Sequence, residues 1–357
     1  MEARARRDWS TADKLKAQIE AAGWRITDRG SRSSVSPAAP ATVEVAGDVH
    51  YGSAAAVPSL LDEPATATWT VAIVASEAPE RVSRLLSALR THAPTGTQVV
   101  VVVNDPSEAQ AAALQPESPD LAAIGGTPPV LLRTSTRLGY AAALNIALRR
   151  AAGEIVLLAD GSAWATGNAL SPLAEVLTDP AVAAVGGFGV ITSDAGPLRP
   201  NTLARSDGAA PVMDVTALEG GWMAFRRSDY RDLGPLDEHF VTPAWLDVWW
   251  TLCLRAGAEP EGVAQARAEA DDAEAAAEAA AGGDAGIAGQ DRGELAEPST
   301  GPAEPDDRET QAPARRAIRL ELPLSRDEVP WPPDRSRLNR RNMYRVLDRF
   351  GWRDDLT

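Results

Sequence analysis

Apolar and polar positions follow one another in a regular order between residues 68 and 258. Short apolar runs with many β-branched residues predict buried strands at 71–75, 99–103, 130–132, 155–159 and 182–185. Between them, apolar residues at three- and four-residue spacing predict helices at 81–90, 140–152 and 170–177. Strands that alternate with helices predict an α/β domain over residues 68–258, with a mainly parallel sheet flanked by helices.

The chain before this domain has a weaker pattern. Leu15, Ile19 and Ala22 share one helix face and predict a helix that ends at Gly23. Ile26 then leads a short extended piece, and residues 1–36 together are expected to form one small, mainly helical segment. Residues 37–67 are rich in Ala, Pro, Ser and Gly and keep no sustained period. We therefore expect a linker there.

The chain after residue 258 divides into two parts. Residues 259–313 contain no aromatic residue, and 15 Asp and Glu face 3 Arg between 259 and 310, so we predict a disordered acidic insert. Residues 314–357 regain apolar periodicity: alternation over 317–324 predicts a strand, and 339–350 predicts a basic amphipathic helix. We expect this C-terminal segment to pack on the α/β domain.

Composition excludes several classes of protein. The net charge of −15 argues against a nucleic-acid-binding protein, and the insert carries most of it. The single cysteine, Cys253, excludes an internal disulfide framework and a Cys-based zinc site. No apolar run reaches the length of a membrane span, and residues 1–8 lack the apolar core of a signal peptide. We expect a cytoplasmic protein, with peripheral membrane contact through Arg337, Arg340, Arg341 and Arg345 as one alternative to a solvated helix face.

Polar clusters follow four of the predicted strands. They are Ser76-Glu77, Asn104-Asp105, the loop Arg133–Gly139, and Asp160-Gly161-Ser162. Ligands of open parallel sheets bind at the carboxyl ends of the strands, so these clusters are expected to converge on one edge. Each cluster taken alone is also typical of a turn.

The same segments resemble a known family. The resemblance covers residues 71–257 and rests on the order and spacing of Val101–Ser107, Arg137–Ala147, Ala152–Asp160, Gly220–Arg227 and Leu233–Phe240. It is a resemblance to the family 2 glycosyltransferases, whose GT-A fold binds nucleotide sugars. It implies that Ser76 and Glu77, with Asn104 or Asp105, contact the nucleoside, and that Arg137 and Gly139 lie near the diphosphate.

The metal site implied by the resemblance is altered in this chain. The family usually ends its fourth strand with Asp-x-Asp, whose carboxylates hold Mg²⁺ or Mn²⁺. Here Asp160 keeps the first position, and Ser162 replaces the second carboxylate with a hydroxyl. Asp160 is therefore the expected metal ligand.

The acceptor side is expected near residues 242–250. The resemblance implies that Asp247 is the general base, although an acid at a helix start also stabilises the helix itself. Four tryptophans crowd this region and predict either a sugar-binding groove or core packing: Trp222, Trp245, Trp249 and Trp250. We expect Trp222 and Trp245 to contact substrate.

The resemblance implies an inverting glycosyltransferase of polysaccharide biosynthesis. It would move a sugar from a nucleoside-diphosphate donor to a carbohydrate or cell-envelope glycan. A catalytically silent nucleotide-sugar-binding or scaffold protein is the alternative, because Ser162 and Leu246 are neutral where acids are usual. Residues 5–36 resemble the C-terminal tail of cysteinyl-tRNA synthetases, which allows a tRNA-associated module as a third reading.

Overall fold

The chain divides into two compact units. The computed structural model describes residues 24–29, 32–37, 41–45, 47–76, 78–115, 118–192, 198–199, 203–206, 210–257, 314–328, 330–334, 336–351, 353 and 356. One unit comprises Met1–Ala39 and Glu259–Pro313, and the other comprises Pro40–Ala258 and Ala314–Thr357. The predicted acidic insert lies outside the described residues.

The described part of the first unit is a β-hairpin. Strand β1 (Trp24–Arg29) pairs antiparallel with β2 (Arg32–Pro37), and Ile26 lies opposite Val35. The extended piece expected from Ile26 lies in β1, and β-branched Ile26, Thr27 and Val35 favour strands in this part of the segment assigned to residues 1–36. Residues 1–23 lie outside the described residues.

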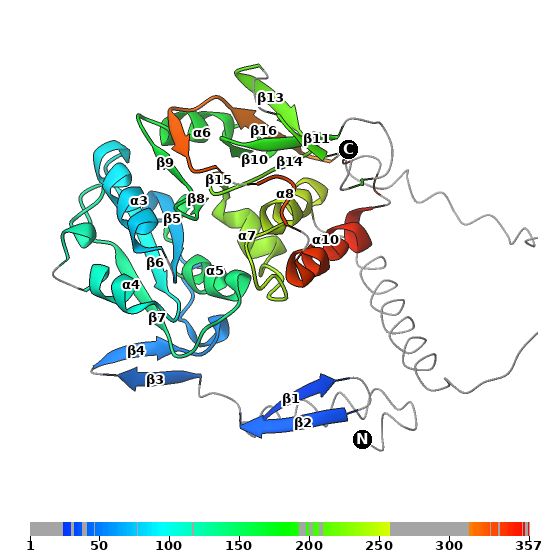
Figure 1. Ribbon diagram of the computed structural model, residues 1–357. Helices are drawn as coiled ribbons and strands as arrows, with labels where there is room; N and C mark the ends of the chain where they lie inside the picture. The colour runs from blue at the N-terminus through cyan, green and yellow to red at the C-terminus, as the bar shows by residue number, and fades with distance from the viewer. Residues whose placement is uncertain are drawn as a thin grey trace, which may run out of the picture. The chain divides into compact units, whose positions relative to one another are not determined.

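The second unit is built on a mixed sheet of ten described strands (Figure 1). The strands, in sheet order, are β13 (Val212–Val215), β16 (Arg316–Leu320), β10 (Val182–Gly186), β15 (Met223–Arg226), β8 (Gly153–Ala159), β5 (Ala67–Ala75), β6 (Thr97–Val103), β7 (Val130–Thr134), β4 (Asp48–Tyr51) and β3 (Thr42–Val45). A parallel block runs from β8 to β4, and β15 is antiparallel to both of its neighbours. Smaller described pieces are β9 (Ala163–Ala165) with β17 (Leu324–Arg326), β11 (Gly189–Thr192) between β12 (Leu203–Arg205) and β14 (Ala217–Leu218), and the 3-10 turns η1 (Ala54–Ala56) and η2 (Pro119–Leu121).

Helices cover both faces of the sheet. Alternate residues of the buried strands enter two separate cores, as the period of two in a strand requires. One core contains α3 (Pro79–His92) and α6 (Leu170–Val176), and the other contains α5 (Tyr140–Arg149), α7 (Arg227–Leu233), α8 (Leu246–Ala256) and α10 (Arg337–Phe350). A shorter helix, α4 (Glu108–Ala113), follows β6. The predicted α/β fold with a mainly parallel sheet is confirmed.

The segment expected to be a linker is part of the folded unit. Within residues 37–67, β4 pairs parallel with β7, and Val57 is only 1 % exposed in the core. Gly47, at φ +88°, connects β3 to β4. Strands of four residues are too short to show a period above an Ala- and Pro-rich background, which explains why the pattern pointed to a linker.

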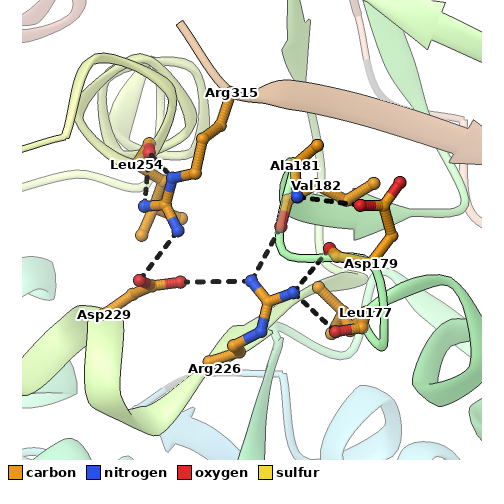
Figure 2. Close-up of polar contacts among 8 residues, drawn as sticks. All are labelled: Leu177, Asp179, Ala181, Val182, Arg226, Asp229, Leu254 and Arg315. Atoms are coloured by element: carbon orange, nitrogen blue, oxygen red, sulfur yellow. Dashed lines mark hydrogen bonds and ion pairs between the residues drawn. The ribbon is translucent and has the colours of Figure 1, made fainter. Parts of the chain in front are cut away.

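The C-terminal segment is anchored in the same unit (Figure 2). Strand β16 pairs with β10, and just before it Arg315 donates to Asp229 at 2.9 Å. Arg226 lies on the other side of Asp229 and donates to the carbonyl oxygens of Leu177, Asp179 and Val182. Two guanidinium groups thus share one carboxylate and tie the end of the chain to the middle of the sheet.

Candidate functional site

A pocket of ≈ 270 Å³ lies where β8 ends. Its lining comes from four parts of the chain: Asp160 after β8, the segment Glu219-Gly220 before β15, and two stretches at 243–248 and 330–339. The pocket therefore combines one predicted metal ligand, the predicted base and the C-terminal segment.

Asp247 lies in the first turn of α8 and faces this pocket. Its Oδ2 accepts a hydrogen bond of 2.9 Å from the backbone N–H of Gly220. Burial and the negative charges of Asp160 and Glu219 raise the pKa of Asp247 to about 7, although the backbone N–H groups of Gly220 and Gly221 oppose the shift. Asp247 can therefore accept or release a proton near neutral pH.

Asp160 is held by the turn that follows it. Ser162 donates to Oδ1 of Asp160 through its backbone N–H at 2.8 Å and through its hydroxyl at 2.5 Å. In the described part of the chain, both of these hydrogen bonds end on Oδ1. Gly221 packs directly on this carboxylate, because a Cβ at position 221 would lie 2.4 Å from Oδ1.

Asp160 offers one carboxylate ligand for a divalent cation, without a second acid beside it at position 162. Among the described residues, no group of three or more His, Cys, Asp and Glu could hold a metal ion. A single carboxylate oxygen fits a hard cation as one ligand, with diphosphate oxygens and water as the others. Ser162 replaces the second acid and instead orients the first.

Residues after β5 and β6 occupy the predicted nucleoside side. Ser76 is partly buried and its carbonyl oxygen accepts from Ser107 N–H at 3.0 Å. Asp105 is exposed and holds a left-handed conformation at φ +48°, whereas Asn104 is 4 % exposed. Glu77 lies outside the described residues.

Asn104 is bonded within the chain. Its Nδ2 donates to Leu138 O at 3.1 Å, and its Oδ1 accepts from Leu138 N–H at 2.9 Å and from the Thr134 hydroxyl at 3.2 Å. The side chain therefore ties the end of β6 to the loop that carries Arg137. This geometry gives Asn104 the role of orienting that loop.

The loop before α5 carries Arg137 and Gly139. Arg137 is exposed, and Gly139 precedes the helix in a space where a Cβ would lie 3.2 Å from Val241 Cγ1. The first two amides of α5 donate to the carbonyl oxygens of Val241 and Phe240, so this neighbouring loop caps the helix start. Asn145 fixes that loop in turn, because its buried amide bonds Leu236 through both Nδ2 and Oδ1.

The four tryptophans separate into core and pocket residues. Trp222 and Trp250 are 0 % exposed, and Trp222 Nε1 donates to Ala163 O at 3.0 Å inside the core. Trp222 is thus not positioned to meet an acceptor, because the antiparallel strand β15 that follows it is buried on both faces. Trp249 packs on Phe240 with ring centroids 5.4 Å apart, and Trp245 is the one of these four tryptophans that lines the pocket.

Sequence reasoning missed three features of the site. Glu219 is 6 % exposed and is bonded by Arg205 at 2.8 and 3.1 Å and by Arg326 at 2.8 Å. Burial and the charges of Asp160 and Asp247 raise the pKa of Tyr140 well above its usual value, so its hydroxyl stays protonated. Trp331 forms a pocket wall. The sequence signal that could have identified Trp331 is its place in a Pro-Trp-Pro-Pro run that follows the acidic segment.

The basic face of α10 is only partly solvated. Arg345 donates to Asp237 Oδ2 at 2.7 Å, whereas Arg337, Arg340 and Arg341 are exposed. None of the described helices is long and apolar enough to cross a membrane.

Comparison with known proteins agrees with this geometry. Residues 70–243 match the family model described as glycosyl transferase family 2. No curated protein sequence matches the chain. Among solved structures, GalNAc-T7 with UDP, GalNAc and Mn²⁺ is similar at a TM-score of 0.50 and 12 % identity, over 84 % of this chain and 49 % of that chain.

Two further solved structures are similar at lower scores. The mannosyltransferase PcManGT from Pyrobaculum calidifontis, with GDP-Man and Mn²⁺, gives a TM-score of 0.39 and 23 % identity over 56 % of this chain and 55 % of that chain. S. aureus TarS gives a TM-score of 0.37 and 15 % identity over 52 % of this chain and 33 % of that chain. The chain spans about half the length of the first two solved chains. The chain thus has the GT-A fold, and its residues 70–243 match the glycosyl transferase family 2 model.

Proposed function

We propose that the chain is an inverting glycosyltransferase that moves a sugar from a nucleoside-diphosphate donor to a hydroxyl group of a glycan. The observation that carries the proposal is the pairing of Asp160 and Asp247 in one pocket, with the pKa of Asp247 raised to about 7. A general base works best when its pKa lies near the working pH.

The donor occupies the carboxyl edge of the parallel strands in this proposal. Ser76, Glu77 and Asp105 contact the nucleoside, and Arg137 pairs with the diphosphate, since a guanidinium matches phosphate oxygens. Gly139 lets the loop approach Val241 closely. Asn104 acts indirectly, through its hydrogen bonds to the loop at Leu138.

Asp160 is the residue that would hold Mg²⁺ or Mn²⁺. Such a cation neutralises charge on a departing diphosphate. Ser162 keeps Asp160 oriented through its two hydrogen bonds.

Asp247 takes the proton in the transfer step. The acceptor oxygen attacks the anomeric carbon from the face opposite the diphosphate, a new C–O bond forms, and the bond to the diphosphate oxygen breaks. The acceptor proton moves to Asp247, and the electron pair of the broken bond leaves with the diphosphate. Inversion follows from this single displacement.

A catalytically silent sugar-nucleotide-binding protein is the second candidate. It is favoured by Ser162, which stands where the family usually has a second carboxylate and bonds Asp160 instead. The two candidates share the donor site and differ in whether Asp247 acts on a proton.

Calorimetric titration with UDP, GDP and dTDP, each with and without Mn²⁺, tests the donor site. Micromolar binding of one nucleotide, strengthened by Mn²⁺ and weakened in Asp160→Ala, would support it. If Asp160→Ala binds every nucleotide as the wild type does, the donor site is misplaced. Binding without donor turnover would favour the silent protein.

A further inference from the structure

The pocket beside Asp247 has two walls of contrasting chemistry. We infer that it is the acceptor subsite and that it selects an uncharged sugar ring, which packs on Trp331 and Trp245 while a hydroxyl group reaches Asp247. This inference rests on the proposed function and adds the class of acceptor.

The apolar wall is built from two tryptophans that are distant in sequence. The rings of Trp245 and Trp331 lie with centroids 5.2 Å apart and planes tilted by 51°. Three prolines continue the same lining: Pro243, Pro330 and Pro333. Aromatic faces carry negative charge density and attract the polarised C–H groups of a sugar ring, so this wall suits a sugar better than a planar polar ligand.

Trp331 donates its Nε1–H to Leu203 O at 3.4 Å, and the residues that follow it are bonded to the loop before α8. Asp334 Oδ1 accepts from Asn339 Nδ2 at 2.7 Å, and Asn339 Oδ1 accepts from the Thr242 hydroxyl at 3.0 Å. These bonds join the C-terminal wall to the loop that leads into α8. Trp245 itself holds a left-handed conformation at φ +69°, a strained geometry of the kind found at ligand sites.

The charged lining is acidic. Asp160, Asp247 and Asp334 all line the pocket, and none of the described lining residues is Lys, Arg or His. The charge of Glu219 is already balanced by Arg205 and Arg326. Asp160 belongs to the donor side in the proposed function, so Asp247 and Asp334 are the carboxylates that would face an acceptor. Carboxylates accept hydrogen bonds from sugar hydroxyls but repel an acceptor that carries a phosphate, sulfate or uronate group.

The size of the pocket agrees with one small ligand. Its ≈ 270 Å³ is just below the range of about 300–1,000 Å³ for small-molecule sites. The acceptor end of a glycan is therefore expected to enter as a single ring, with the remainder of the acceptor outside.

Saturation-transfer difference NMR on the full chain tests this inference. The neutral probes are the methyl glycosides of glucose, galactose, mannose and N-acetylglucosamine, and the anionic probes are glucose 6-phosphate, galactose 6-phosphate and glucuronic acid. We expect transfer to the ring C–H protons of at least one neutral probe, and no stronger transfer to any anionic probe.

Variants of the wall give the second readout. Trp331→Ala should weaken binding of the neutral probe about threefold to tenfold, and Trp331→Phe should restore most of it, because the ring face is what binds. Tyr344→Ala is the matched control, since Tyr344 is a 56 % exposed aromatic of the same C-terminal segment outside the pocket. Nucleotide affinity, measured in parallel by calorimetry, should be unchanged in all three variants.

The outcomes separate the two proposals. Three results overturn the acceptor inference: an anionic probe binds more strongly than the neutral probes, no neutral probe binds, or Trp331→Ala leaves neutral binding unchanged. If nucleotide still binds in any of these cases, the proposed function stands. If neutral glycosides bind at Trp331 but no nucleotide binds, the proposed transferase fails, and the pocket is a sugar site of another kind. Trp331→Phe keeps the test valid if Trp331→Ala does not fold.

Discussion

The backbone N–H of Gly220 donates to Oδ2 of Asp247 at 2.9 Å, and the next residue, Gly221, packs on Asp160. One glycine pair therefore sets the positions of both carboxylates in the pocket. Gly220 and Gly221 both have positive φ, +63° and +74°, but only a Cβ at 221 meets another group. Alanine substitutions at 220 and 221 therefore test whether contact with Gly221 positions the Asp160 carboxylate.

Gly221→Ala is expected to displace the Asp160 carboxylate. A Cβ there would lie 2.4 Å from Oδ1, so the turn or the carboxylate must move, and we expect at least about a tenfold loss of donor turnover. Gly220→Ala is the control: it carries similar backbone strain of about 1–2 kcal/mol and meets nothing within 4 Å. Equal losses in kcat for the two variants would mean that strain, and not contact with Asp160, causes the effect.

Asp247→Asn is expected to stabilise the protein at high pH. The pKa of Asp247 is raised to about 7 in the folded state, above the value of about 3.9 for an unfolded chain. Stability from this group is therefore fully present below pH 3.9 and falls as the pH rises toward 7, because the folded state resists ionisation. The Tm of Asp247→Asn relative to wild type should increase between pH 5 and pH 8. A constant difference in Tm over that range would contradict the raised pKa.

Asn104→Ala is expected to loosen the loop that carries Arg137. It leaves the amide of Leu138 without its acceptor and should cost about 1–3 kcal/mol of unfolding free energy, with weaker nucleotide binding. Asn168→Ala is the control, because the exposed Asn168 bonds Ser171 in its own turn, away from the loop of Arg137. Urea denaturation and calorimetry measure both effects. If Asn104→Ala binds nucleotide as tightly as Asn168→Ala does, Asn104 does not position the loop of Arg137 for binding.

Glu219→Gln is expected to shift the proton affinity of Asp247 and to weaken the fold. Removing a negative charge near Asp247 lowers its pKa, so the pH midpoint of donor turnover should move down. Loss of the charge that Arg205 and Arg326 share should also cost up to about 3–5 kcal/mol of unfolding free energy. Exposed Glu175, changed to Gln, should alter neither quantity. A midpoint that stays fixed would show that Glu219 does not act on Asp247.

Much of the α/β core could be predicted because its signals are local. The run Val99–Val103 is buried on both faces in β6, and the apolar spacing of residues 81–90 appears as the buried face of α3. Asp160 could be placed at the site because a polar residue that ends a buried strand lies at the ligand-binding edge. These inferences need no knowledge of distant contacts.

The features that were missed depend on contacts between distant segments. Trp331 joins the pocket only because β16 and α10 fold back onto the unit, and its own surroundings in sequence are polar and Pro-rich. Trp222 and Trp245 look alike in sequence, and only the packing of β15 and α8 puts the first in the core and the second at the pocket. Glu219 needs Arg205 and Arg326 from two short strands that carry no period.

The pH dependence of donor turnover tests the central claim most directly. Nucleoside-diphosphate release from UDP-, GDP- and dTDP-sugars should be measured for wild type and Asp247→Asn between pH 5 and pH 9. We predict that kcat/KM of the wild type rises with pH to a plateau above a midpoint near 7, and that Asp247→Asn loses about 10²–10⁴-fold in turnover with unchanged nucleotide affinity. Wild-type turnover in Asp247→Asn would contradict the account.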